Sequence, residues 1–222
     1  MSLPRGSVSL VADLDGVLVD SSPAVFAAWS HWADAHGIDP LATFALGHGL
    51  STLDHLRAVA PGLATEAEAA RIADLERAAL GTVSAMPGAA RLCEALRGAR
   101  WAVVTSCPRD VAFARLAAAG LPGPTVLVGL EDVTRPKPEP EGFRRVARLL
   151  EAEAVLVVED APAGVRAARA AGAAVLGVAT THDAVDLGEA DAVIADLTGL
   201  TVLSSPDGTV TVLAPVDTGA PR

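Results

Sequence analysis

The chain of 222 residues contains little cysteine, few aromatic residues and no long apolar run. Its two cysteines, Cys93 and Cys107, do not have the spacing of a metal site, so a reducing cytoplasm is the expected location. No apolar run reaches the roughly 20 residues that a membrane-spanning helix needs. The segment before Asp13 lacks the long apolar stretch of a signal peptide, so none is expected.

Tyrosine is absent and aromatic residues make up only 3% of the chain, so small aliphatic side chains must fill the core. The formal net charge is -10 at pH 7, which disfavours nucleic acid and anionic membranes as partners. A small phosphorylated metabolite is still an acceptable partner if a metal ion and local donors neutralise its charge. With 51% hydrophobic residues, the length suits one domain or a core with a small insert; the oligomeric state, a monomer included, stays open.

Beyond about residue 100, short apolar runs alternate with segments that have helical spacing. The runs predict strands and the segments between them predict helices. Predicted strands cover 101–105, 124–128, 154–158, 173–178 and 192–194, predicted helices cover 110–119, 141–150 and 163–171, and a terminal hairpin joins 201–203 to 209–213. Continuous apolar strands separated by helices are typical of a parallel sheet covered on both faces. The prediction is an α/β fold with a Rossmann-like, doubly wound parallel sheet.

Residues 21–85 lack an obvious strand and interrupt this alternation directly after the first strand, at 7–12. Ser22 can cap a helix that has Pro23 at its first position. We interpret 21–85 as an inserted, all-helical cap domain. The core domain then consists of residues 1–20 and 86–222.

Two aspartates follow the first predicted strand, in the motif Asp13-Leu14-Asp15-Gly16. Residues two apart on a strand point the same way, so both carboxylates leave the end of the strand together. A bare pair of like charges repels and is costly to desolvate, which a divalent cation between them would relieve. An ordinary strand-end turn is the alternative, because Asp and Gly are turn residues.

Polar residues also follow two further predicted strands. Thr105 and Ser106 combine a hydroxyl with backbone N–H groups that enter a helix, which suits phosphate oxygens. Glu159 and Asp160 form a second acidic pair. Because ligands of open parallel sheets lie beyond the carboxyl ends of the strands, we expect the three strand ends to form one site.

Lys137 is the only lysine, since the other sixteen of the 17 basic residues are arginine. The exception indicates a position that needs a compact ammonium group instead of a planar guanidinium. Pro136 and Pro138 flank it, and Pro138 favours an extended backbone that aims the side chain. A surface lysine without a role is the alternative.

These residues together predict phosphoryl transfer with Mg²⁺ as the cofactor, because Mg²⁺ prefers hard oxygen ligands. The metal and Lys137 can neutralise a phosphate group. Asp13 can then attack phosphorus and form an aspartyl phosphate. Asp15 can protonate the leaving alcohol and later deprotonate the attacking water.

Four ordered stretches resemble the motifs of the haloacid dehalogenase-like hydrolase superfamily. They are Asp13 to Ser21, Val104 to Ser106, Pro136 to Pro138 and Val157 to Asp160. The helical insert is similar to the C1-type cap of the phosphoglycolate phosphatase and beta-phosphoglucomutase branch. Residues 101–106 and 158–165 resemble sugar phosphatases and the glycerol-3-phosphatase or 2-deoxyglucose-6-phosphatase group. The resemblance implies a Mg²⁺-dependent phosphatase acting on small sugar or polyol phosphate monoesters.

The resemblance also implies a role for each matched residue. Asp13 would be the nucleophile and a metal ligand, and Asp15 the acid/base, with its backbone carbonyl on the metal. The other matched positions would hold the phosphate group or the metal. These are Thr105, Ser106 and Lys137 for the phosphate, and Asp160 with, directly or through water, Glu159 for the metal.

The cap departs from several relatives, which carry an arginine after a histidine-glycine or lysine-glycine pair. Here the loop from His48 to Thr52 has none. A phosphosugar mutase of the beta-phosphoglucomutase type, the main alternative, must hold a second phosphate in its cap, so this loss argues against it. A receiver-type signalling domain also combines acids, a hydroxyl and a lysine, but the helical insert counts against it. Cys107 replaces a small or polar residue and has no assigned role.

Several cap residues are weaker candidates. His48 is predicted to contact substrate, with a simple turn histidine as the alternative. Trp29 and Trp32 could line the substrate face, although at least one is expected in the core. The remaining histidines of the segment are expected on solvated helix faces; they are His31, His36 and His55.

Overall fold

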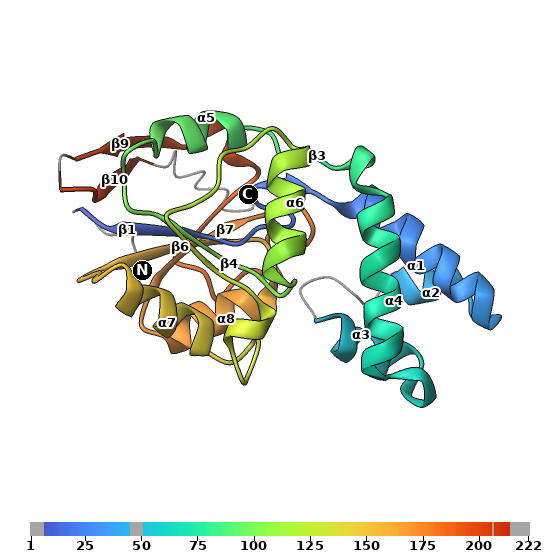
Figure 1. Ribbon diagram of the computed structural model, residues 1–222. Coiled ribbons are helices and arrows are strands. Elements are labelled where there is room, and N and C mark those ends of the chain that lie inside the picture. Colours follow the sequence, from blue (N-terminus) through green and yellow to red (C-terminus); the bar gives the residue numbers. More distant parts are fainter. Residues whose placement is uncertain (1–6, 45–50, 206, 214–222) are drawn as a thin grey trace, which may run out of the picture.

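A six-stranded parallel sheet lies at the centre of the molecule (Figure 1), in a computed structural model that describes residues 7–44, 51–205 and 207–213. The strand order is β5-β4-β1-β6-β7-β8, and every neighbouring pair is parallel. The strands are β1 (Ser9–Ala12), β4 (Ala102–Val104), β5 (Val126–Val128), β6 (Val155–Glu159), β7 (Ala174–Val178) and β8 (Ala192–Ile194). The predicted doubly wound α/β fold is confirmed.

Successive residues of each strand supply two separate cores, because side chains alternate between the faces of a sheet. On one face Leu10 packs in a cluster with Val103 and with Leu116 of a covering helix. On the other face Val11 packs in a cluster with Phe143. Both faces are therefore apolar, as the continuous hydrophobic strands predicted.

Helices cover both faces of the sheet. On the face of Leu10 lie α5 (Ala89–Ala95), α6 (Arg109–Ala118) and the hairpin of β9 (Thr201–Ser204) and β10 (Val210–Leu213). On the opposite face lie α7 (Glu141–Leu149) and α8 (Pro162–Ala170). Figure 1 shows α5 with the hairpin on one side of the strands and α7 with α8 on the other.

The described residues between β1 and α5 include four α-helices that lie beside the sheet instead of over it (Figure 1). They are α1 (Ser22–His36), α2 (Pro40–Phe44), α3 (Thr52–Val59) and α4 (Glu66–Ala78). Trp32, Leu56 and Ile72 belong to a third apolar cluster within them. These helices occupy the stretch predicted as a cap.

Short elements complete the described chain. The 3-10 helices are η1 (Pro61–Leu63), η2 (Leu80–Thr82), η3 (Leu130–Asp132) and η4 (Leu197–Gly199). No helix in the described ranges combines the length and apolar character that crossing a membrane requires.

A two-residue ladder joins the two ends of the helical segment. Val19 and Asp20 form β2 and pair antiparallel with Ala85 and Ser84 of β3. The expectation of no strand within 21–85 was therefore wrong at its last two residues, because so short a ladder leaves no periodic pattern. The expected cap at Ser22 was wrong as well, because Ser22 is the first residue of α1 and Ser21 holds the cap position. The Asp20 carboxylate accepts a hydrogen bond from the Ser22 backbone N–H at 3.0 Å.

Replacing Leu10 by alanine is expected to lower the free energy of unfolding by about 3 kcal/mol, because this fully buried side chain of β1 would leave a cavity. The matched control is Leu203→Ala in β9, where the side chain is 57% exposed and a change below about 0.5 kcal/mol is expected. Urea unfolding followed by circular dichroism measures both. Equal effects would contradict the assignment of β1 to the centre of the core.

Candidate active site

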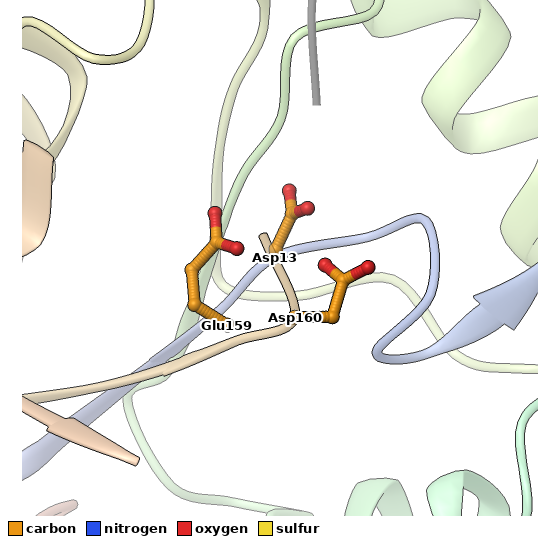
Figure 2. Close-up of side chains that lie close together, drawn as sticks. All are labelled: Asp13, Glu159 and Asp160. Carbon is orange, nitrogen blue, oxygen red and sulfur yellow. The ribbon is translucent and has the colours of Figure 1, made fainter. Parts of the chain in front are cut away.

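Three carboxylates meet where β1 and β6 end. Asp13 follows β1, Glu159 is the last residue of β6 and Asp160 comes next. Each offers an oxygen, and these oxygens lie within 4.8 Å of one another. Figure 2 shows the three side chains side by side. The strand register explains this arrangement. Ala12 lies opposite Val158 on the neighbouring strand, so Asp13 and Glu159, which follow them, lie side by side.

Lys137 lies against two of these carboxylates. Its ammonium nitrogen is 2.9 Å from Asp13 Oδ1 and 2.5 Å from Glu159 Oε1, and its side chain is only 6% exposed. Burial by itself would lower the pKa of this ammonium group, but Asp13 and Glu159 outweigh burial and hold the pKa above its usual value. The lysine is therefore charged and enclosed, which rules out the alternative of a surface lysine without partners.

The negative charge of the acidic cluster is only partly neutralised by Lys137. Burial raises the pKa of both Asp13 and Asp160, although Lys137 opposes the shift. Three carboxylates face one ammonium group, and the buried Asp160 Oδ1 has no hydrogen-bond partner. A hard divalent cation would satisfy that oxygen and offset the excess charge. The donor set therefore fits Mg²⁺, with Asp13 and Asp160 as the side chains best placed to hold it.

Glu159 has partners for both of its oxygens. Oε1 contacts Lys137, and Oε2 accepts a hydrogen bond from the Ala161 backbone N–H at 2.9 Å. Its contacts favour a role in orienting Lys137, and its predicted role as a metal ligand stays a prediction. Asp160 accepts a hydrogen bond on its Oδ2 from Thr181 Oγ1.

Gly16 explains why the first motif ends in glycine. Its φ is +78°, in the left-handed region, and a Cβ at this position would lie 2.1 Å from Asp160 Oδ2. Any side chain would therefore displace the carboxylate that is expected to hold the metal. The backbone turns at Gly16 and passes close to the Asp160 carboxylate. The motif is therefore both a strand-end turn and a part of the acidic site.

A cavity opens above the carboxylates, with about 850 Å³ of empty space including the part open to solvent. Asp13, Asp15, Thr105, Ser106 and Asp160 line it, so five predicted site residues meet there. Lys137 lines a smaller neighbouring hollow, also bordered by Thr105 and Ser106, and reaches the cavity through its contact with Asp13. The three strand ends therefore lie around one space, as expected.

Cys107 also borders the cavity. Its backbone N–H donates to Thr105 Oγ1 at 3.2 Å, which fixes the turn after β4. Burial raises the pKa of the Cys107 thiol to about 12. At neutral pH the group is therefore a protonated thiol, which is a poor nucleophile.

The helical segment supplies the opposite wall of the cavity, through Trp29 of α1, Thr52 and His55 of α3 and Glu76 of α4. The expectation that His55 faces solvent was wrong: it is 3% exposed and its ring centroid lies 3.8 Å from that of Trp29. Its Nε2 lies 2.7 Å from the Thr43 carbonyl oxygen. A hydrogen bond across twelve residues leaves no periodic signal, so the sequence pattern could not reveal it.

The other cap candidates fall in three places. Trp32 belongs to the core of the helical segment, where its Nε1 donates to Glu68 Oε2 at 2.6 Å. His36 is half-buried, with Nδ1 2.8 Å from the Trp32 carbonyl oxygen, and His31 is exposed as expected. His48 lies outside the described residues, so its predicted contact with substrate stays a prediction.

One oxygen of Asp15 forms an ion pair with an arginine of α6. Its Oδ2 lies 2.7 Å from Arg115 Nη1, while Arg115 Nη2 donates to Glu76 Oε2 at 2.6 Å. Arg115 and Glu76 were missed by the sequence interpretation. One signal was available, because Arg115 follows the buried Val111 by four residues and thus lies on the apolar side of α6, where an arginine needs partners.

Comparison with known proteins identifies the class. Residues 10–172 match the family model of the haloacid dehalogenase-like hydrolases. Hexitol phosphatase A of Escherichia coli (strain K12) is 42% identical over 207 residues, covering 90% of this chain and 96% of that protein. 2-Deoxyglucose-6-phosphate phosphatase 2 of Saccharomyces cerevisiae is 30% identical, covering 95% and 96%.

A solved structure agrees with these sequence matches. The crystal structure of a hydrolase from Pseudomonas syringae superposes with a TM-score of 0.73 at 29% identity, covering 85% of this chain and 94% of that one. The protein belongs to the haloacid dehalogenase-like hydrolases. Its resemblance to this family, first seen in four motifs, is confirmed.

Replacing Asp160 by asparagine is expected to weaken Mg²⁺ binding by about 10-fold or more, because one anionic ligand becomes neutral. Titration calorimetry with MgCl₂ in the absence of substrate measures the change. Asp183→Asn is the matched control, since that exposed residue lies outside the acidic cluster and should leave the affinity unaltered. Equal affinities in all three proteins would contradict the assignment of the metal site.

Proposed function

We propose that the protein is a Mg²⁺-dependent phosphatase that hydrolyses small sugar or polyol phosphate monoesters through an aspartyl-phosphate intermediate. The observation that carries the proposal is the buried contact of the Lys137 ammonium with Asp13, within a cluster of three carboxylates beside a cavity. The names of the two phosphatase relatives support the substrate class, since both align with nearly the full length of this chain.

Asp13 is placed to act as the nucleophile. Lys137 holds its Oδ1, which fixes the carboxylate at the end of β1 beside the cavity. The Asp13 oxygen attacks phosphorus, the bond from phosphorus to the alcohol oxygen breaks, and Asp15 supplies a proton to that oxygen. Thr105 and Ser106 would orient the phosphate oxygens from the end of β4. The products of this step are the free alcohol and an acyl phosphate on Asp13.

Water completes the reaction. Asp15, now a carboxylate, accepts a proton from water as the water oxygen attacks phosphorus, and the bond from phosphorus to Asp13 breaks. Inorganic phosphate and the original Asp13 carboxylate result. Mg²⁺, held by Asp13 and Asp160 when bound, would supply positive charge that offsets the charge of the phosphate. Closure of the cavity by the helical segment would exclude competing water in the first step.

The wall formed by the helical segment suits a leaving group with several hydroxyls. Ser22 and Thr52 offer hydroxyls, and Trp29 offers a flat apolar ring. Sugars and polyols carry both C–H faces and hydroxyl groups, and such alternating surfaces match this mixture.

The mutase alternative is less supported. Within the described part of the helical segment, no lysine or arginine lines the cavity, and the sequence of residues 45–50 contains none. The guanidinium of Arg115, which does line the cavity, comes from α6 and is paired with Asp15 and Glu76. A second phosphate would therefore lack a free cationic partner in this wall, whereas a neutral polyol needs none.

Purified protein with MgCl₂ is expected to release phosphate from hexitol, hexose or glycerol phosphates in a malachite green assay. EDTA should abolish the activity and excess Mg²⁺ should restore it. Asp13→Asn should reduce phosphate release to background, because an amide is not a nucleophile. Conversion of a hexose 1-phosphate to its 6-phosphate without phosphate release would favour the mutase instead.

Lys137→Arg is expected to lower kcat/KM by about 100-fold or more, because a planar guanidinium does not fit the enclosed space between Asp13 and Glu159. The matched control is Arg135→Lys, two residues away and exposed, which should retain normal turnover. Full activity of the Lys137 variant would show that any cation suffices at this position.

A further inference from the structure

Arg115 forms a charged bridge between two parts of the molecule. Its guanidinium, on α6, contacts Asp15 with one nitrogen and Glu76 of α4 with the other, at 2.7 and 2.6 Å. The side chains of Arg115 and Glu76 are 5% and 10% exposed, and that of Asp15 is 30% exposed. All three border the cavity above the acidic cluster.

Joining α4 to α6 does not by itself require this buried arginine. A second link between the same helices exists at the surface, where Arg77 Nη2 lies 2.7 Å from Asp110 Oδ2. That pair is 41% and 63% exposed, so its charges keep most of their hydration. Burial of the Arg115 guanidinium costs free energy unless ion pairs compensate its charge. Unlike Arg77, it contacts Asp15.

We infer that Arg115 is a positioning residue that sets the direction of the Asp15 carboxylate, with Glu76 anchoring the other end of its planar fork. The inference rests on the proposed function, in which Asp15 transfers the proton. A carboxyl group turns about the single bond that carries it, and a guanidinium that contacts its Oδ2 and is itself held by Glu76 limits that rotation. Because the anchor comes from α4, the position of the helical segment is transmitted to the acid/base.

The consequence depends on the leaving group. A polyol leaves as a strongly basic alkoxide, which needs a proton from a correctly directed acid as the phosphorus–oxygen bond breaks. p-Nitrophenolate is a stable anion and leaves without one. Loss of Arg115 should therefore impair the first step with a polyol phosphate far more than with p-nitrophenyl phosphate. A general loss of folding or of metal binding would impair both alike.

The experiment measures alcohol release in a single turnover, with enzyme and MgCl₂ in excess, by rapid quench or stopped flow. The two substrates are p-nitrophenyl phosphate and the polyol phosphate that the wild-type protein hydrolyses fastest. For Arg115→Met we expect a loss of about 100-fold with the polyol phosphate, the lower end of a general acid's contribution, and less than about threefold with p-nitrophenyl phosphate. Arg77→Met, which breaks only the surface link, should match the wild type with both.

A second pair of variants keeps the inference testable if Arg115→Met does not fold. Glu76→Met removes the anchor and should slow polyol release by about 10-fold, with p-nitrophenyl phosphate unaffected. Glu76→Gln retains an oxygen that accepts from Arg115 and should restore most of the rate. Melting temperatures of all variants are compared in parallel.

The outcomes separate the two proposals. If the wild-type protein hydrolyses neither ester, the proposed function is wrong and this inference is overturned with it. If the wild type is active and the folded variants lose both activities equally, or lose neither, only the role of Arg115 is overturned. A selective loss with the polyol phosphate supports it.

Discussion

The close approach of three carboxylates at the ends of β1 and β6 is the constraint on which the rest of the structure depends. Like charges held this close in a buried place repel, and they persist only where positive charge is brought to them. Lys137 supplies part of that charge through its contacts with Asp13 and Glu159. The remainder explains why the cluster fits a divalent cation and, beyond it, the phosphate group of a substrate. The same imbalance that would destabilise an ordinary protein thus prepares this one for its ligands.

The sheet and the helical segment contribute different properties to the site. Parallel strands in register place the acids and the Thr105-Ser106 turn at one edge, and an apolar core packs against each face of the sheet. The helical segment has an apolar core of its own and presents a mixed polar wall to the cavity. The acidic cluster and Lys137 therefore come from the part that contains the sheet, and the opposite wall of the cavity comes from a part with its own apolar core. Arg115 is the buried side chain that links these two parts, through ion pairs with Asp15 and Glu76.

Much of the sheet and of the acidic cluster could be predicted from the sequence, because both depend on local patterns. Buried strands such as β6 are continuous apolar runs, and residues directly after parallel strands must share an edge. The solitary lysine was informative because arginine fills every other basic position. What could not be predicted depends on tertiary contacts: the burial of His55 against Trp29, the bridge from Arg115 to Glu76, and the donation from Thr181 to Asp160. No spacing rule connects residues that are 26, 39 or 21 positions apart.

The short ladder of β2 and β3 has a consequence for how such a protein can diversify. Both passages of the chain between the sheet and the helical segment run side by side, from Val19 and Asp20 to Ser84 and Ala85. The helical segment is thus attached to the rest of the chain at this one ladder. A stretch bounded in this way can be shortened, rebuilt or transplanted without threading new chain through the sheet. Preference for one alcohol over another could therefore diverge in evolution, or be redesigned in the laboratory, while the phosphorus chemistry stays untouched.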